Sequence, residues 1–161
     1  MSEPLKKTMA DEARLLNEYA ARLGALQRTV ARRDWEAVEK HIAGLRNLTG
    51  EIERAEDARL EAYRRLKASL SIAGGASFDQ VLSRLEAPVR EELAEQQRGL
   101  RIAIIRVKGA AGLLGYYART MADTSRAVLE ELFPHRKGRM YSRSGRARAT
   151  AEESLMLDGK Y

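Results

Sequence analysis

The chain has 161 residues, of which 32% are charged and only 6% aromatic, a balance typical of extended helical proteins rather than of sheet sandwiches. It contains no cysteine, which excludes disulfides and thiolate chemistry and favours a reducing compartment. Much of the net charge of +6 lies near the end, because residues 135–161 contain seven Lys or Arg residues against three acidic ones. The N-terminus lacks the apolar run of a signal peptide, and Arg106 and Lys108 interrupt the longest apolar stretch. We therefore expect a bacterial cytoplasmic protein without membrane insertion.

A heptad pattern of apolar residues predicts a long amphipathic helix over residues 5–70. This pattern slips at residues 32–35, where Asp34 suits the N-cap of a new helix and Glu36 suits its first turn. The sequence leaves open whether the helix breaks there or continues. The predicted apolar stripe, spaced as a coiled-coil partner requires, consists of Leu16, Tyr19, Leu23, Leu26, Val30, Val38, Ile42, Leu45, Ile52, Tyr63, Leu66 and Leu70.

A second long helix is expected after a glycine-rich turn. Gly74 and Gly75 are expected to end the first helix, and the capping-box pattern of Ser77 and Gln80 predicts a short helix to about residue 85. Pro88 suits the first turn of the next helix, which we expect to run to about residue 133 and to stop at Pro134. Its predicted stripe consists of Val89, Leu93, Leu100, Ala103, Val107, Ala110, Leu114, Tyr117, Met121, Thr124, Val128 and Leu132.

These patterns predict an all-α fold, an antiparallel two-helix coiled-coil hairpin over residues 1–133, with a short intervening helix and a flexible basic tail over residues 134–161. In the register of such a hairpin, Ile42 lies near Val107 and Arg28 near Met121. The tail is rich in Gly, Ser and Arg, and a short helix over residues 150–158 is the only element expected in it.

The second helix carries more apolar surface than a two-helix hairpin can bury. Beside its main stripe lies another one, formed by Ile102, Ile105, Gly109, Leu113 and Tyr116. Each large side chain left exposed forgoes about 1.5–3 kcal/mol of burial free energy, and each helical glycine costs about 1 kcal/mol relative to alanine. We therefore expect another element to pack closely at Gly109, Gly112 and Gly115. A partner helix, a second copy of the chain or a folded-back N-terminus would each fill this surface.

No catalytic constellation or metal site can be assembled from the sequence. The two histidines, His41 and His135, have no metal-ligand partner at helical spacing. There is no P-loop, and the helical glycines do not form a dinucleotide-binding fingerprint because no strand precedes them. We therefore expect no enzyme activity and no cofactor.

The chain resembles the FlgN family of flagellar export chaperones. The resemblance rests on the leucine repeats, on the aspartate break at residues 33–38, and on the helix end Leu132-Phe133-Pro134-His135 followed by the segment from Met140 to Gly145. The chain has Gly109-Ala110-Ala111-Gly112 where family members often carry Asn.

The resemblance implies a chaperone that binds the C-terminal region of the hook-associated proteins FlgK and FlgL, prevents premature assembly and delivers them to the export gate protein FlhA. On this reading, the cargo-binding residues are Ile105, Leu113, Tyr116, Met121, Val128, Leu132 and Phe133. Tyr141 and Gly145 would mark the gate-docking segment, and Leu155, Met156 and Leu157 could clamp over the bound cargo.

Two other functions stay open at this point. One is a coiled-coil adaptor or oligomerising hairpin of the export apparatus, possible as a homodimer. The other is nucleic-acid binding by the Arg-rich tail, which is less expected because the charge excess lies in the tail alone.

Overall fold

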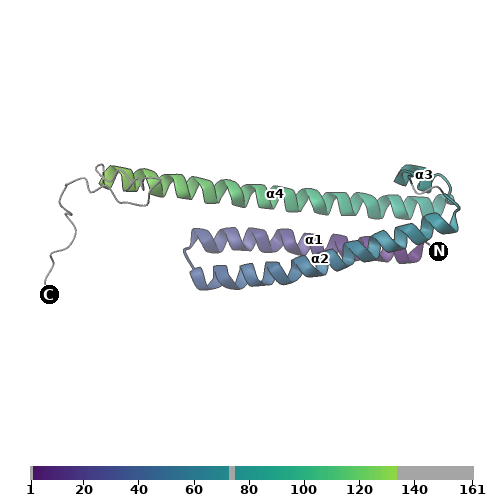
Figure 1. Ribbon diagram of the computed structural model, residues 1–161, viewed down its shortest axis with the longest axis horizontal. Coiled ribbons are helices and arrows are strands. Elements are labelled where there is room, and N and C mark those ends of the chain that lie inside the picture. The colour runs from purple at the N-terminus through teal and green to yellow at the C-terminus, as the bar shows by residue number, and fades with distance from the viewer. Residues whose placement is uncertain (1, 73–74, 134–161) are drawn as a thin grey trace, which may run out of the picture. The chain divides into compact units, whose positions relative to one another are not determined.

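The computed structural model describes residues 2–72 and 75–133, and within these ranges all regular structure is helical. The described helices are α1 (Glu3–Ala31), α2 (Trp35–Ser69), α3 (Phe78–Leu82) and α4 (Ala87–Leu132) (Figure 1). The chain divides into two compact units, Met1–Thr120 and Met121–Tyr161. The all-α class and the short intervening helix are therefore confirmed. The continuity of the first helix, which the sequence left open, is decided by a break between Ala31 and Trp35. The predicted tail and its short helix lie outside the described residues.

The first long helix is interrupted by a complete reversal of the chain. Arg33 adopts φ 58°, its amide donates to the Val30 carbonyl, and the amide of Asp34 donates to the Thr29 carbonyl. This is the Schellman motif, which ends a helix and turns the chain. The Asp34 side chain then accepts a hydrogen bond from the Ala37 amide at 3.1 Å and caps α2, as predicted. As a result α1 and α2 lie side by side in opposite directions (Figure 1).

In the first unit, α4 runs parallel to α1. Lys6 of α1 forms an ion pair with Glu92 of α4, and Asn17 accepts a hydrogen bond from Arg106 at 2.8 Å. Both pairs join residues almost equally far apart in the sequence, which happens only when two helices run in the same direction. The predicted proximity of Arg28 and Met121 requires residues 5–31 to run antiparallel to α4. This prediction is therefore wrong. The reversal at Arg33 turns the expected two-helix hairpin into three long helices.

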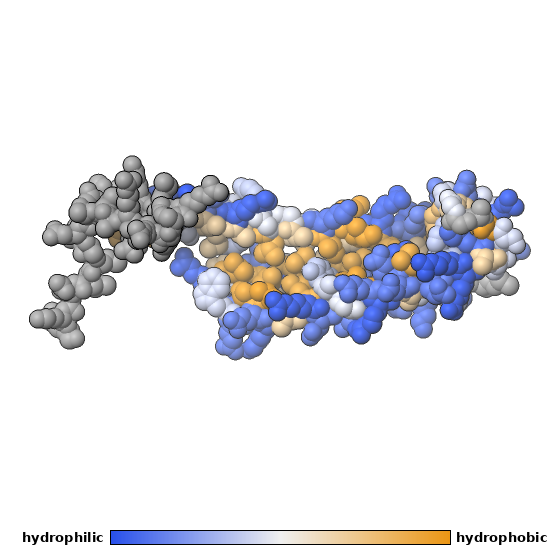
Figure 2. Space-filling view, in the orientation of Figure 1, coloured by the Kyte–Doolittle hydropathy of each residue, from blue (hydrophilic) through white to orange (hydrophobic). Residues whose placement is uncertain are grey.

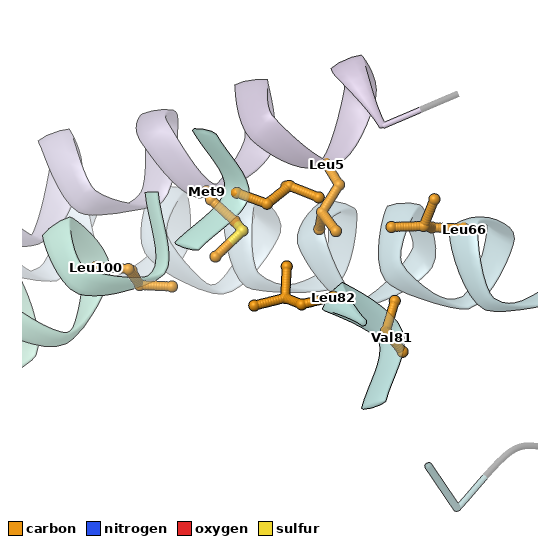
Figure 3. Close-up of a cluster of buried hydrophobic side chains, with 7 residues drawn as sticks. Leu5, Met9, Leu66, Val81, Leu82 and Leu100 are labelled. Atoms are coloured by element: carbon orange, nitrogen blue, oxygen red, sulfur yellow. The ribbon is translucent and has the colours of Figure 1, made fainter. Parts of the chain in front are cut away.

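Two apolar clusters hold the first unit together. The first gathers side chains from all four helices, with Val81 and Leu93 fully buried. Figure 3 shows Leu5 and Met9 of α1 together with Leu66 of α2 in this cluster. The second cluster centres on Leu23, Leu26 and Leu45, against which Val107, Ala110 and Leu114 of α4 pack. The members of the predicted apolar stripe that lie on α1 thus face the core, whereas Ile42, a member on α2, is exposed.

The second helix ends before the glycine pair. Ser71 adopts φ 52°, and the amides of Ser71 and Ile72 donate to the carbonyls of Ala68 and Lys67 in a second Schellman motif. The prediction that Gly74 and Gly75 supply the C-cap is therefore wrong.

The boundaries of α3 and α4 agree better with the sequence. The Ser77 hydroxyl accepts from the Gln80 amide, and the Gln80 side chain accepts from the Ser77 amide, which confirms the capping box. Pro88 lies in the first turn of α4, whose last residue is Leu132. Among the described residues, no helix is both long and apolar enough to cross a membrane.

Candidate docking surfaces on α4

In the first unit, α4 carries apolar residues on two opposite faces. The inner face contacts α1, α2 and α3 through Leu93, Leu100 and Val107. The outer face carries Ile102, Ile105, Leu113 and Tyr116, whose exposed fractions are 49%, 61%, 54% and 66%. We call these four residues the outer stripe. At 100° per residue they fall within an arc of about 80° on the helix, so they lie on one side of it.

The glycines beside the outer stripe have no neighbour on their exposed side. A Cβ atom built on Gly109, Gly112 or Gly115 would meet nothing within 4 Å. The expected close approach of another element is therefore not made by α1, α2 or α3. Glycine destabilises a helix interior, but it lets a neighbouring element come close to the α4 backbone, and the space for such a neighbour is open.

A second apolar area lies between α4 and the α1–α2 hairpin. Figure 2 shows apolar side chains gathered on the half of the first unit where α1 ends and α2 begins, and hydrophilic ones over the other half. Several apolar residues of this area are only half-buried, among them Val30 of α1, Val38 of α2 and Leu114 of α4. Sequence reasoning missed this area, because it exists only when the chain reverses at Arg33.

In the second unit, the last residues of α4 carry several exposed apolar side chains. Val128, Leu132 and Phe133 are exposed, as expected for cargo-binding residues, whereas Met121 is half-buried. Leu129 is exposed as well and was not predicted. The spacing of Leu129 from Leu132 and Phe133, three and four residues, is the signal that would have found it.

Some exposed apolar residues belong to neither part of the predicted surface. Ile104 lies on α4 about 100° around the helix from Ile105, toward the inner face. Trp35 and Ile42 lie in the first turns of α2. The remaining candidates, Tyr141, Gly145, Leu155, Met156 and Leu157, lie outside the described residues.

The segment of α4 that carries the outer stripe contains basic residues but no acidic ones. Residues 96–120 contain no Asp or Glu but five Lys or Arg residues: Arg98, Arg101, Arg106, Lys108 and Arg119. Arg106 is turned toward α1, where it donates to the Asn17 side chain. This part of α4 is therefore apolar and positively charged at once.

Titratable groups with displaced pKa values lie in structural contacts away from the outer stripe. Hydrogen bonds to Glu3 and then to Glu92 raise the pKa of Lys6, and burial raises the pKa of Tyr63. No group of three metal-ligating side chains occurs among residues 2–72 and 75–133. The described surface is suited to bind an apolar partner through α4.

Comparison with known proteins gives one match. The family model described as FlgN protein matches residues 1–149. No curated protein and no solved structure matches the chain.

Proposed function

Because this chain belongs to the FlgN family, a family of flagellar export chaperones rather than of enzymes, we propose that its cargo is the C-terminal region of the hook-associated proteins FlgK and FlgL. The chaperone holds this region before assembly and delivers it to the export gate protein FlhA. This role requires the cytoplasm, where the cargo is synthesised.

The observation that carries this proposal is the exposed apolar surface of α4. An amphipathic helix binds another helix by burying apolar anchors at spacings of three and four residues. On the outer stripe, Ile102 is three residues from Ile105 and Leu113 is three residues from Tyr116. In the second unit, Val128 and Leu132 are four residues apart. Large exposed apolar surfaces on soluble proteins mark interaction sites, and this surface supports recognition of an unassembled helical segment.

Cargo binding is tested by placing charge on this surface. Ile105→Asp with Tyr116→Asp, and separately Leu129→Asp with Leu132→Asp, should each weaken binding of a FlgK C-terminal fragment at least tenfold by calorimetry. The altered side chains are exposed, so the circular dichroism spectrum should stay helical. Trp35→Asp is the matched control, since it removes an exposed apolar side chain from α2 and should leave the affinity unchanged. Unaltered affinity in both double variants would exclude these residues as the cargo site.

Delivery to the export gate is assigned to the segment after α4. By the family resemblance, Tyr141 and Gly145 contact FlhA, and Leu155, Met156 and Leu157 clamp the cargo. The full-length Tyr141→Ala protein should keep its cargo affinity but lose co-purification with FlhA and reduce filament assembly. Normal export by this variant would contradict the gate-docking role of Tyr141.

A homodimer formed through α4 competes with this assignment for the same surface. Sedimentation equilibrium distinguishes the two. If a dimer forms without cargo, Ile105→Asp should dissociate it, and cargo should compete with it.

A further inference from the structure

The charge around the outer stripe indicates which kind of helix it receives. We infer that the outer stripe binds a partner α-helix with an acidic edge, which approaches the α4 backbone closely at Gly109 and Gly112. The identity of the partner rests on the proposed function, since the helix would belong to the cargo. The chemistry of the helix follows from α4 alone.

The acidic edge is inferred from Arg101 and Lys108. These residues are seven positions apart, so they lie on the same edge of the outer stripe, two helical turns from each other. Both are exposed, and within the described part of the chain neither forms an ion pair. In paired helices, flanking charges of opposite sign select the partner and its orientation. A partner with two acidic residues seven positions apart therefore matches this edge.

The close approach is inferred from the glycines. Gly109 lies within the arc of the outer stripe and Gly112 lies at its edge, and both have open space where a Cβ atom would be. Small residues allow helix backbones to approach more closely than large ones do. A partner helix crossing here would gain contacts with Ile105 and Leu113, which lie on either side of Gly109 in the sequence.

Two other occupants fit these features less well. A second copy of the same face would bring Arg101 and Lys108 near other cations, because residues 96–120 contain no acid to neutralise them. An anionic membrane surface would match the charge but not the glycines, because membrane-surface helices gain affinity from buried apolar area, which glycine does not supply.

The test uses the full-length protein and two labelled helical peptides. Both peptides carry the same apolar stripe with alanine at its centre, and they differ only in having Glu or Lys at two edge positions seven residues apart. Fluorescence anisotropy should show at least tenfold tighter binding of the Glu peptide. Arg101→Glu with Lys108→Glu should reverse this preference, whereas Arg46→Glu with Arg54→Glu, an equal charge change on exposed positions of α2, should leave it intact. Equal binding of both peptides, or loss of preference in the α2 control, would overturn the inference.

The role of the glycines is tested by a variant that should become more stable but bind the partner helix more weakly. Gly109→Ala with Gly112→Ala should raise the melting temperature, because alanine favours helix and meets no neighbour. The same variant should bind the Glu peptide about tenfold more weakly. A variant with higher melting temperature and unchanged affinity would overturn the close approach.

Four further outcomes separate this inference from its competitors and from the proposed function. Binding to phosphatidylglycerol vesicles but to neither peptide would overturn it, and so would a dimer that Ile105→Asp dissociates and that excludes the Glu peptide. A FlgK fragment that binds Arg101→Glu/Lys108→Glu as tightly as the original chain would overturn the inference and leave the proposed function standing. If the FlgK fragment does not bind the original chain but the Glu peptide does, the proposed function fails and the inference is supported.

Discussion

Arg33 and Ser71 end the two helices of the hairpin in a conformation that glycine usually occupies. Each lies one residue beyond the C-cap with positive φ, and each begins a Schellman hydrogen-bond pattern. A side chain in this region costs about 1–2 kcal/mol. The motif is retained because other contacts favour it: Ile72, just after Ser71, packs against the cluster that contains Leu66.

Replacing Arg33 by glycine should therefore stabilise the protein. We expect Arg33→Gly to raise the free energy of unfolding in urea by about 0.5–1 kcal/mol, since relief of the positive φ exceeds the entropy that glycine adds to the unfolded chain. Arg32→Gly is the matched control, because Arg32 has φ −84° and gains no such relief. A lower stability of Arg33→Gly than of the original chain would contradict this account of the turn.

Glu12 is a buried charge whose partner comes from the opposite helix. The residue is 5% exposed, and its carboxylate forms an ion pair with Arg59. Glu12→Ala should lower the free energy of unfolding by about 1–3 kcal/mol, because the partly buried Arg59 guanidinium is left with only its longer ion pair to Glu56 at 3.7 Å. The double variant Glu12→Leu/Arg59→Leu should recover most of this loss in a urea-denaturation cycle. Equal losses in the single and double variants would show that the pair does not act as a unit.

At the scale of elements, α4 contributes one face to stability and exposes the other. Leu93 is fully buried in the first cluster, whereas Leu113 of the outer stripe is exposed. Leu93→Ala should lower the free energy of unfolding by about 3 kcal/mol, and Leu113→Ala should change it by less than about 0.5 kcal/mol. Chemical denaturation of the two variants checks this difference. A large loss in Leu113→Ala would mean that the outer stripe is part of the core.

The sequence predicted the elements better than their arrangement. Periodicity located the helical segments of α1, α2 and α4, and the capping-box pattern of Ser77 and Gln80 located α3. Asp34 was identified as an N-cap by its type and position. The reversal could not be predicted because arginine at position 33 gives no turn signal, unlike glycine. The register failed for the same reason, since it assumed a continuous first helix. The exposure of Ile105, Leu113 and Tyr116 was predicted because the second helix has more apolar residues than one interface can bury. The partner that binds them could not be identified from a single sequence.

At the scale of the whole molecule, the raised pKa values of Lys6 and Tyr63 predict that the free energy of unfolding falls at alkaline pH. The pKa of Lys6 is raised by its hydrogen bonds to Glu3 and Glu92, so its contribution is complete below its unfolded pKa of 10.5 and is lost as pH rises through the higher folded value. Burial raises the pKa of Tyr63 above 10.0, so the unfolded phenol ionises first and this too weakens folding at high pH.

We therefore expect the free energy of unfolding to be nearly constant from about pH 7 to 9 and to fall above about pH 10. Tyr63→Phe should make this fall less steep, because it removes the phenol while keeping the ring that lies 5.8 Å from Phe78. Urea denaturation between pH 8 and pH 11 measures both slopes. Identical slopes would exclude Tyr63 as a source of the effect.

The parallel course of α1 and α4 also has a consequence for the order of folding. Leu26 and Leu45 meet across a short turn, whereas Asn17 and Arg106 are joined by the whole of α2 and α3. Closing the shorter loop costs less chain entropy, so the α1–α2 hairpin should form first and α4 should dock last. Substitutions at Leu23 should then slow refolding, while those at Leu100 should mainly accelerate unfolding. A nascent chain on the ribosome would thus complete its α1–α2 hairpin before α4, the helix to which we assign cargo binding, packs against it.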